Sequence, residues 1–310
     1  MLGRDLISLH DLTVEEVQKI FETAFKIKAS PDKYSDALAN KTMAMIFEKP
    51  SLRTRVSFET GMTQFGGHAI YLGPSDISLG KRESVPDIAR TLDRMVDVIM
   101  ARTFSHNAIL QLAEYADAPV INGLSDLLHP CQALADYMTI LEKKGDLKGL
   151  TLAFVGDGNN VANSLMFGGA KTGVSVRVVC PKGFEPKEDM VAAAREDGKA
   201  MGATMSVTND LDEGLAGADV VYTDVWASMG QEAEAEARKA AFRPFQVNAA
   251  LMAKAKEDAL FLHCLPAHRG DEVTDEVIDS WRSVVFDEAE NRLHAQKAVI
   301  YELLVGEEMI

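Results

Sequence analysis

Cysteine is scarce in this chain, with three residues at positions 131, 180 and 264 among 310. An odd number at wide spacing does not provide a disulfide framework, so we expect a reducing, cytoplasmic compartment. The same spacing argues against a structural zinc site, and we predict no bound metal. Long apolar runs and the charged and apolar regions of a signal peptide are also missing, which excludes a membrane role.

Basic residues are few relative to acidic ones: 32 Lys and Arg stand against 47 Asp and Glu, for a net charge of −15. Such a chain repels nucleic acid and anionic membranes, so we expect neither as a partner. An anionic metabolite would need a local cluster of basic residues. The hydrophobic fraction of 47% is ample for packed cores, and the length fits one large or two medium domains.

A local basic cluster follows the first predicted strand, residues 42–47. Pro50 disfavours helix at the residue before it, and Ser51 is a good N-cap for a helix that starts there. The amides at the start of that helix form an anion site. The next turn adds a hydroxyl and two fixed cations, from Arg53, Thr54 and Arg55. A surface turn with solvated arginines is the simpler alternative, but the combination favours a phosphate site.

Strands and helices alternate along the chain, which predicts parallel sheets with helices on both faces. We expect strands at 42–47, 69–72, 96–101, 119–122, 151–155, 175–179, 204–207, 220–223, 259–262 and 283–286. We expect a loop at 73–83, an exposed helix at 232–241 and helices from Ala133 to Lys144 and from Asn291 to Val305. The turn at 145–149 is a plausible domain boundary.

Ligands of open α/β sheets bind beyond the carboxyl ends of the strands. Polar residues follow several predicted strands there: Arg102, His129, Asn160, Asp224, and His263 with Cys264. Each has a simpler reading as a solvated or structural residue, and Cys264 beside His263 also fits a nucleophile or a metal ligand. Gly156 and Gly158 suggest a dinucleotide turn, yet Val161 occupies the third glycine position.

His129 and Gln132 lie one helical turn apart. A histidine that donates to a carbonyl oxygen and a glutamine that accepts from an amide would together hold a urea-like group. Cys131 between them is better explained by core packing, because buried cysteine behaves as a small hydrophobic residue.

Four motifs in order resemble those of the ornithine branch of the aspartate/ornithine carbamoyltransferase family. They are Ser51-Leu52-Arg53-Thr54-Arg55, His129-Pro130-Cys131-Gln132, Asp224 to Gly230 (DVWASMG) and His263-Cys264-Leu265-Pro266. Their order and separations match over essentially the whole chain. The first two are shared across the family, and the last two are specific to enzymes that use ornithine.

The resemblance implies two α/β domains: residues 1–145 for carbamoyl phosphate and residues 146–290 for ornithine. The last helix, 291–310, returns to the first domain. It further implies a homotrimer or an assembly of trimers, in which a neighbouring subunit completes the phosphate site.

The resemblance also assigns roles to individual residues. Carbamoyl phosphate is bound by Ser51, Leu52, Arg53, Thr54, Arg102, His129, Gln132, Cys264, Leu265 and Arg292. Ornithine is bound by Asn160, Asp224, Ser228 and Met229, and the catalytic residues are Arg102, His129 and Cys264. Two positions depart from the family pattern. Leu52 replaces the usual threonine, and Ser78 replaces a glutamine that often reaches into a neighbouring subunit.

The implied reaction is carbamoyl transfer from carbamoyl phosphate to the side-chain amine of L-ornithine, giving citrulline and phosphate in arginine metabolism. This chemistry needs no metal or organic cofactor. Other acceptors remain open, namely aspartate, N-acetylornithine and putrescine, although the acceptor motif shows no extra cation for the second carboxylate of aspartate. A catalytically silent dinucleotide-binding protein is the alternative from another class. A biosynthetic and a degradative role also both remain open.

Overall fold

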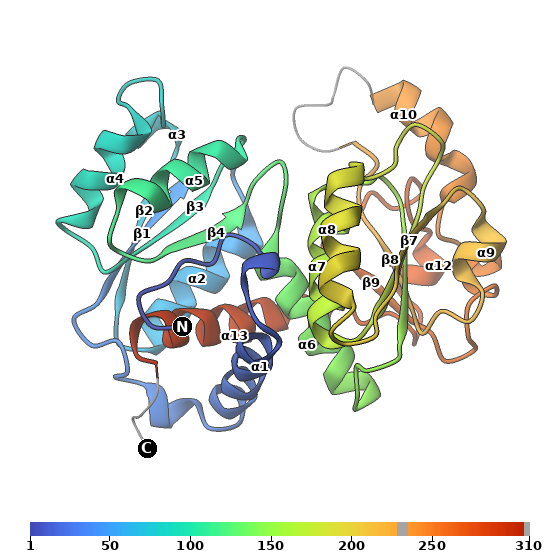
Figure 1. Cartoon of the computed structure of the whole chain (residues 1–310), viewed down its shortest axis with the longest axis horizontal. Helices are drawn as coiled ribbons and strands as arrows, with labels where there is room; N and C mark the ends of the chain where they lie inside the picture. Colours follow the sequence, from blue (N-terminus) through green and yellow to red (C-terminus); the bar gives the residue numbers. More distant parts are fainter. Residues whose placement is uncertain (228–234, 307–310) are drawn as a thin grey trace. The chain divides into compact units, whose positions relative to one another are not determined.

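The computed structural model describes residues 1–227 and 235–306, which form two compact units. Unit 1 comprises Met1–Met138 and Glu290–Ile310, and unit 2 comprises Thr139–Ala289. Each unit contains a sheet flanked by helices (Figure 1). The predicted fold class is therefore confirmed. No helix within the described residues is long and apolar enough to cross a membrane.

The sheet of unit 1 has four parallel strands in the order β2-β1-β3-β4. The strands are β1 (Thr42–Phe47), β2 (His68–Leu72), β3 (Val98–Arg102) and β4 (Val120–Leu124). The order reverses between β1 and β3, so the segments that follow these two strands are neighbours at the carboxyl edge. This reversal is where open α/β sheets bind ligands.

Helices α4 and α5 cover one face of this sheet, and α2 and the later turns of the C-terminal helix α13 (Val285–Leu304) lie on the other (Figure 1). The helices of unit 1 are α1 (Val14–Ala29), α2 (Leu52–Gln64), α3 (Pro74–Ile77), α4 (Val85–Asp93), α5 (His106–Tyr115) and the first part of α6 (Pro130–Lys144). Short 3-10 turns are η1 (Leu9–Asp11) and η2 (Pro31–Tyr34). Helix α1 begins at a capping box of Thr13 and Glu16, which pairs free amides at its N-terminus.

The sheet of unit 2 has five parallel strands in the order β7-β6-β5-β8-β9. The strands are β5 (Thr151–Val155), β6 (Ser175–Val179), β7 (Met205–Thr208), β8 (Val220–Thr223) and β9 (Leu260–His263). Its helices are α7 (Asn160–Thr172), α8 (Glu188–Gly198), α9 (Leu211–Leu215), α10 (Ala235–Phe242), η4 (Arg243–Phe245), α11 (Ala249–Met252) and α12 (Asp275–Ile278). The order reverses between β5 and β8, which places the turn after β5 beside the segment after β8.

The C-terminal helix α13 (Val285–Leu304) corrects the predicted strand at 283–286 and the predicted helix start at Asn291. Residues 283–286 are not a strand, because the helix begins at Val285 and Ser283 forms only an isolated bridge with Phe261. A short run of β-branched and aromatic residues cannot be assigned by periodicity alone, since it packs equally well as a strand or a helical turn. From Glu290 onward α13 packs in unit 1, where Glu302 accepts a hydrogen bond from Thr23 (2.6 Å).

Three smaller expectations also change. Helix α6 begins at Pro130 rather than Ala133, because proline is well suited to the first turn of a helix. The expected loop at 73–83 contains the short helix α3, which also has a proline in its first turn. The expected exposed helix at 232–241 overlaps α10, where residues 236, 237, 239 and 240 are exposed. Arg238 is the exception, since it is buried and pairs with Asp157 (3.0 Å).

Candidate functional site

The segment after β1 forms the helix start that the sequence predicts. Ser51 has an extended backbone (φ −156°, ψ 117°), and its hydroxyl accepts a hydrogen bond from the Thr54 amide (3.3 Å). The remaining free amides of the first turn of α2 carry the positive end of the helix dipole. Leu52 is 73% exposed, so this residue offers an anion its backbone amide rather than a side chain.

Residues from four elements of unit 1 form one polar cluster, which we call the unit 1 cluster: Ser51, Arg53, Thr54, Arg102, His129, Gln132 and Arg292. Thr54 and Gln132 are buried, and both accept hydrogen bonds from the Arg292 guanidinium. These bonds are 3.3 Å long to Thr54 Oγ1 and 2.6 Å long to Gln132 Oε1. The third donor of Arg292, Nε, binds Gln296 Oε1 (2.9 Å). This fork fixes the plane of the guanidinium.

Arg292 was expected at the start of the last helix, and that expectation is wrong. Because α13 begins at Val285, Arg292 lies inside the helix and is only 2% exposed. The network continues from Gln296, whose amide donates to Ser57 Oγ on α2 (2.6 Å). Contacts between α13 and α2 therefore hold Arg292 against the first turn of α2.

His129 lies in a strongly cationic and buried environment. Burial lowers the pKa of its imidazole well below the usual value, and the nearby cations of Arg292, Arg102 and Arg53 lower the pKa further. The imidazole is therefore neutral at ordinary pH and can donate one N–H to an oxygen without carrying a charge. Three arginines within electrostatic range of one histidine form a site for a strongly anionic ligand.

A second group lies at the carboxyl edge of the unit 2 sheet, and we call it the unit 2 cluster: Asn159, Asn160, Asp224, Cys264 and Leu265. Asp224 follows β8 and is buried. Its carboxylate accepts from the Cys264 thiol (3.1 Å), from Asn159 Nδ2 (2.8 Å) and from the Val225 amide (2.8 Å). A buried carboxylate held in this way is suited to an ammonium group.

Asn159 donates to Asp224 and also caps α7. The adjacent Asn160, which the sequence indicates as a contact of ornithine, stays a prediction. Gly158 is required by space, because a Cβ there would lie 2.1 Å from the Pro186 nitrogen. Ser228 and Met229 lie outside the described residues.

His263 is a structural neighbour of Cys264 rather than its base. Its Nδ1 accepts a hydrogen bond from the Leu265 amide (2.8 Å), and its Nε2 faces the buried carboxylate of Glu272 (3.2 Å). These contacts hold Leu265 in a left-handed conformation (φ 54°). Candidate ligand atoms of Asp224, His263 and Cys264 lie within 4.8 Å of one another, but hydrogen bonds occupy both ring nitrogens of His263. The absence of a metal site remains a prediction.

Ser78, the position that departs from the family pattern, ends the short helix α3. Its backbone is left-handed (φ 45°), and its hydroxyl donates to the Pro74 carbonyl (3.0 Å). In this chain the side chain therefore makes a local turn contact.

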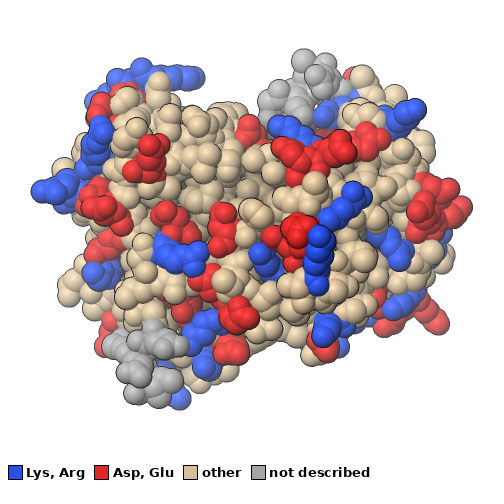
Figure 2. Space-filling model, in the orientation of Figure 1, with Lys and Arg blue, Asp and Glu red and all other residues tan. Residues whose placement is uncertain are grey.

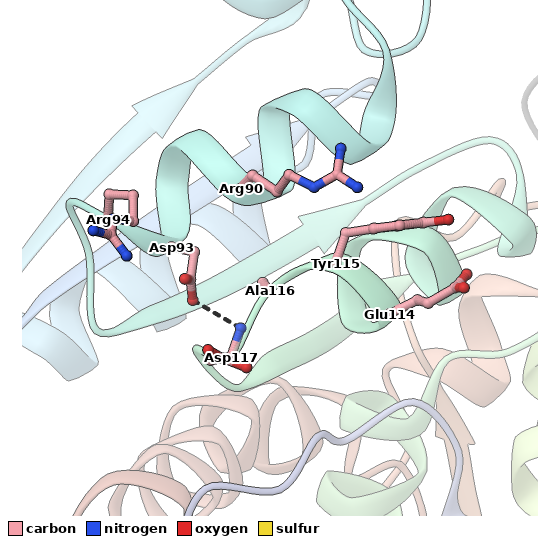
Figure 3. Close-up of a pocket in the computed structure, with 7 residues that line it drawn as sticks. All are labelled: Arg90, Asp93, Arg94, Glu114, Tyr115, Ala116 and Asp117. Atoms are coloured by element: carbon pink, nitrogen blue, oxygen red, sulfur yellow. Dashed lines mark hydrogen bonds between the residues drawn. The ribbon is translucent and has the colours of Figure 1, made fainter.

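An open groove of about 410 Å³ between α4 and α5 is a separate feature of unit 1. Figure 3 shows Arg90 extending toward Tyr115, while the Asp93 carboxylate accepts a hydrogen bond from the Asp117 amide (2.8 Å). Its charged side chains are of both signs, and it includes no residue of the unit 1 cluster. The groove therefore lacks the cationic character that an anionic substrate needs.

Charges on one face of the molecule are likewise mixed. Figure 2 shows Lys and Arg interspersed with Asp and Glu over the face in view. The buried environment around His129 is strongly cationic, although the chain as a whole is acidic.

Comparison with known proteins agrees with this geometry. Residues 4–142 match the family model described as aspartate/ornithine carbamoyltransferase, carbamoyl-P binding domain. Residues 148–303 match the model for the Asp/Orn binding domain of the same family. The two matches cover nearly the whole chain.

Two curated relatives are similar over almost their full length. The anabolic ornithine carbamoyltransferase of Pyrococcus furiosus is 56% identical over 99% of this chain and 98% of that protein. The ornithine carbamoyltransferase of Anoxybacillus flavithermus is 55% identical over 97% of each.

Solved structures show the same relationship. The P. furiosus enzyme superposes with a TM-score of 0.95, at 56% identity and with 99% of each chain covered. That of Thermus thermophilus gives a TM-score of 0.88 at 43% identity, over 98% of this chain and all of the other. The chain belongs to the aspartate/ornithine carbamoyltransferase family.

Proposed function

We propose that this chain transfers the carbamoyl group of carbamoyl phosphate to the side-chain amine of L-ornithine, giving L-citrulline and phosphate. The chain is a carbamoyltransferase, and its relatives of 53–57% identity are named ornithine carbamoyltransferases. The observation that carries the proposal is the buried, neutral His129 among three arginines beside the α2 helix start.

The unit 1 cluster suits carbamoyl phosphate. The phosphate is proposed to bind the amides of residues 51–54 and the Arg53 guanidinium, where helix start and cation neutralise its charge. The carbonyl oxygen would accept hydrogen bonds from Thr54, Arg102 and His129. Gln132 and the Leu265 backbone would hold the amide, and Arg292 would contact the phosphate or carbonyl oxygens. The domains at 1–145 with 291–310 and at 146–290 would carry the two substrates, in keeping with the two matched family models.

The unit 2 cluster suits ornithine. Asp224 would bind the α-ammonium group, with Asn160, Ser228 and Met229 completing the amino-acid end. Cys264 would contact the reacting amine and one edge of carbamoyl phosphate. Its thiol donates to Asp224, so its role is to orient the amine rather than to form a covalent intermediate.

The reaction forms one C–N bond and breaks the C–O bond to phosphate. The neutral amine attacks the carbonyl carbon, negative charge develops on the carbonyl oxygen, and phosphate leaves while the nitrogen loses a proton. Donors already in place for that oxygen contribute about 3–4 kcal/mol each. The amine must be deprotonated first, so the rate should rise from neutral to alkaline pH.

The test is product formation from carbamoyl phosphate with ornithine, aspartate, N-acetylornithine and putrescine offered separately. Citrulline from ornithine alone is expected. Turnover with a different amine would contradict ornithine as the acceptor. It would leave the assignment of carbamoyl phosphate to the unit 1 cluster unchanged. If the protein transfers the carbamoyl group to none of these amines but binds NAD, the result would support the dinucleotide-binding alternative.

We also propose a homotrimer, alone or assembled further, in the cytoplasm, acting in arginine biosynthesis. The name of the P. furiosus relative, which includes the word anabolic, supports the pathway, and the three free cysteines fit a reducing compartment. Strand β2 at the sheet edge has no buried residue and exposes Ile70 (40%), and helix α2, which packs against β2, exposes Val56 (52%). Val56→Glu should shift the mass measured by light scattering toward the monomer; an unchanged mass would contradict this interface.

A further inference from the structure

Gln132 is held between one group that can only donate hydrogen bonds and one that, when ionised, can only accept them. Arg292 Nη1 donates to Gln132 Oε1 (2.6 Å), and Gln132 Nε2 donates to Asp136 Oδ1 (2.8 Å). A guanidinium has no acceptor and an ionised carboxylate has no donor. The orientation of the Gln132 amide is therefore set by its partners, with the oxygen toward Arg292 and the nitrogen toward Asp136.

Asp136 is completely buried, at 0% exposure, one helical turn after Gln132 on α6. A buried carboxylate carries a desolvation cost that an apolar residue of similar size would avoid. Packing alone therefore gives no reason for a carboxylate at this position. Its contact with Gln132 gives one, because the carboxylate accepts the hydrogen bond that keeps the amide nitrogen away from Arg292.

The consequence concerns what Gln132 can offer a ligand. A carbonyl oxygen can accept two hydrogen bonds, so Oε1 can accept from a ligand N–H while it accepts from Arg292. An amide free to turn would present donor and acceptor in turn, and its site would distinguish an NH₂ group from a methyl group poorly. A methyl group cannot donate to the second lone pair of Gln132 Oε1. A ligand with a methyl group in place of NH₂ therefore binds less tightly.

We propose that Asp136 is a specificity-determining positioning residue that fixes Gln132 as a hydrogen-bond acceptor for the carbamoyl NH₂ group. The proposal rests on the proposed function, since it takes carbamoyl phosphate as the ligand of the unit 1 cluster. Asp136 acts through Gln132 and does not touch the substrate. Its effect is discrimination between carbamoyl phosphate and an acyl phosphate that carries a methyl group instead.

The experiment measures the KM for carbamoyl phosphate and the inhibition constants of acetyl phosphate and inorganic phosphate. The discrimination ratio is the acetyl phosphate constant divided by the carbamoyl phosphate KM. Asp136→Leu removes the acceptor and should lower this ratio about tenfold. The constant for inorganic phosphate should stay unchanged, because phosphate has no amide. Asp136→Asn can still accept from Gln132 Nε2 and should restore the ratio to within about threefold of the parent chain.

Two further variants separate positioning from general damage. In a Gln132→Met background, Asp136→Leu should change the ratio no further, because the residue through which it acts is gone. Glu302→Leu is the matched control: it removes another buried carboxylate of unit 1, which binds Thr23. It should lower stability and leave the ratio unchanged. Asp136→Ala, which also removes the acceptor, replaces the leucine variant if that variant does not fold.

An unchanged ratio in Asp136→Leu would overturn the proposal, as would an equal weakening of inorganic phosphate. An equal loss in Asp136→Asn would also overturn it, because charge rather than acceptor geometry would then matter. Citrulline formation by the parent chain is measured in the same series. If the parent chain is active and the ratio does not move, only the role of Asp136 fails; if the parent chain is inactive with every amine, the proposed function fails.

Discussion

The unit 1 cluster and the unit 2 cluster solve different binding problems. In unit 1, α2, α6 and α13 are joined by a network in which Arg292 binds Thr54, Gln132 and Gln296. In unit 2, the cluster centres on one carboxylate, Asp224, with a thiol and an amide as side-chain partners. The difference suits the proposed substrates, because a phosphate dianion needs several fixed cations and a primary ammonium group needs one anion.

The largest expected effect comes from breaking the unit 1 network at its centre. Arg292→Leu removes three hydrogen-bond donors and a buried cation, so kcat/KM for carbamoyl phosphate should fall about a thousandfold. Arg292→Lys keeps the charge without the planar fork, so its kcat/KM for carbamoyl phosphate should fall less, about a hundredfold. Steady-state kinetics measure both, and thermal unfolding shows whether each variant is folded. Equal losses in the two would mean that the positive charge contributes nothing without the planar fork, whereas parent-like kinetics of Arg292→Lys would mean that the fork geometry is unimportant.

A smaller effect is expected in the unit 2 cluster, where one neutral donor is lost. Cys264→Ala removes the thiol that donates to Asp224 and contacts the proposed amine, so kcat/KM for ornithine should fall about tenfold. Cys264→Ser keeps a donor and should lie within about threefold of the parent chain. If the alanine variant left both kcat and KM for ornithine unchanged, the orienting role would be refuted.

The smallest expected effect is the contribution of His129 in the unit 1 cluster to the pH dependence of stability. Burial and three arginines lower the pKa of His129 in the folded chain, whereas the unfolded chain should titrate near 6.5. Below that pH His129 binds a proton in the unfolded chain but not in the folded chain. The free energy of unfolding therefore falls as the pH falls. At pH 5.5 the effect of His129 lowers the free energy of unfolding by about 1.4 kcal/mol.

Denaturant unfolding of the parent chain and of His129→Gln between pH 7.5 and 5.5 measures this difference. Burial also lowers the pKa of His106 and His294, so both proteins should lose stability on acidification. The parent chain should lose more. Parallel curves would mean that His129 is protonated in the folded state.

The local parts of the fold could be predicted from sequence because their signals are local. The strand from Thr42 to Phe47 is a buried apolar run, and the helix at Ser51 begins with a good N-cap after proline. The turn after β5 was identified by its glycines, and Gly158 is indeed needed for close approach to Pro186. Four short motifs in order were sufficient for the family.

The long-range parts could not be predicted from local patterns. Gln132 and Arg292 are 160 residues apart, and no sequence spacing indicates that they bind each other. Asp136 follows Gln132 by one turn and resembles a solvated helical residue until its complete burial is known. Arg292 was expected at a helix start because Val284 to Phe286 suggested a strand, whereas tertiary packing extends the helix through that run.

The most direct test of a divided substrate site is a comparison of two variants against both substrates. Thr54→Val removes a hydroxyl of the unit 1 cluster, and Asp224→Asn removes the charge of the unit 2 cluster. We predict that Thr54→Val raises the KM for carbamoyl phosphate alone. Asp224→Asn should raise the KM for ornithine alone, by roughly 10- to 100-fold. The reverse pattern, or equal changes in both constants for Asp224→Asn, would contradict the assignment of one substrate to each unit.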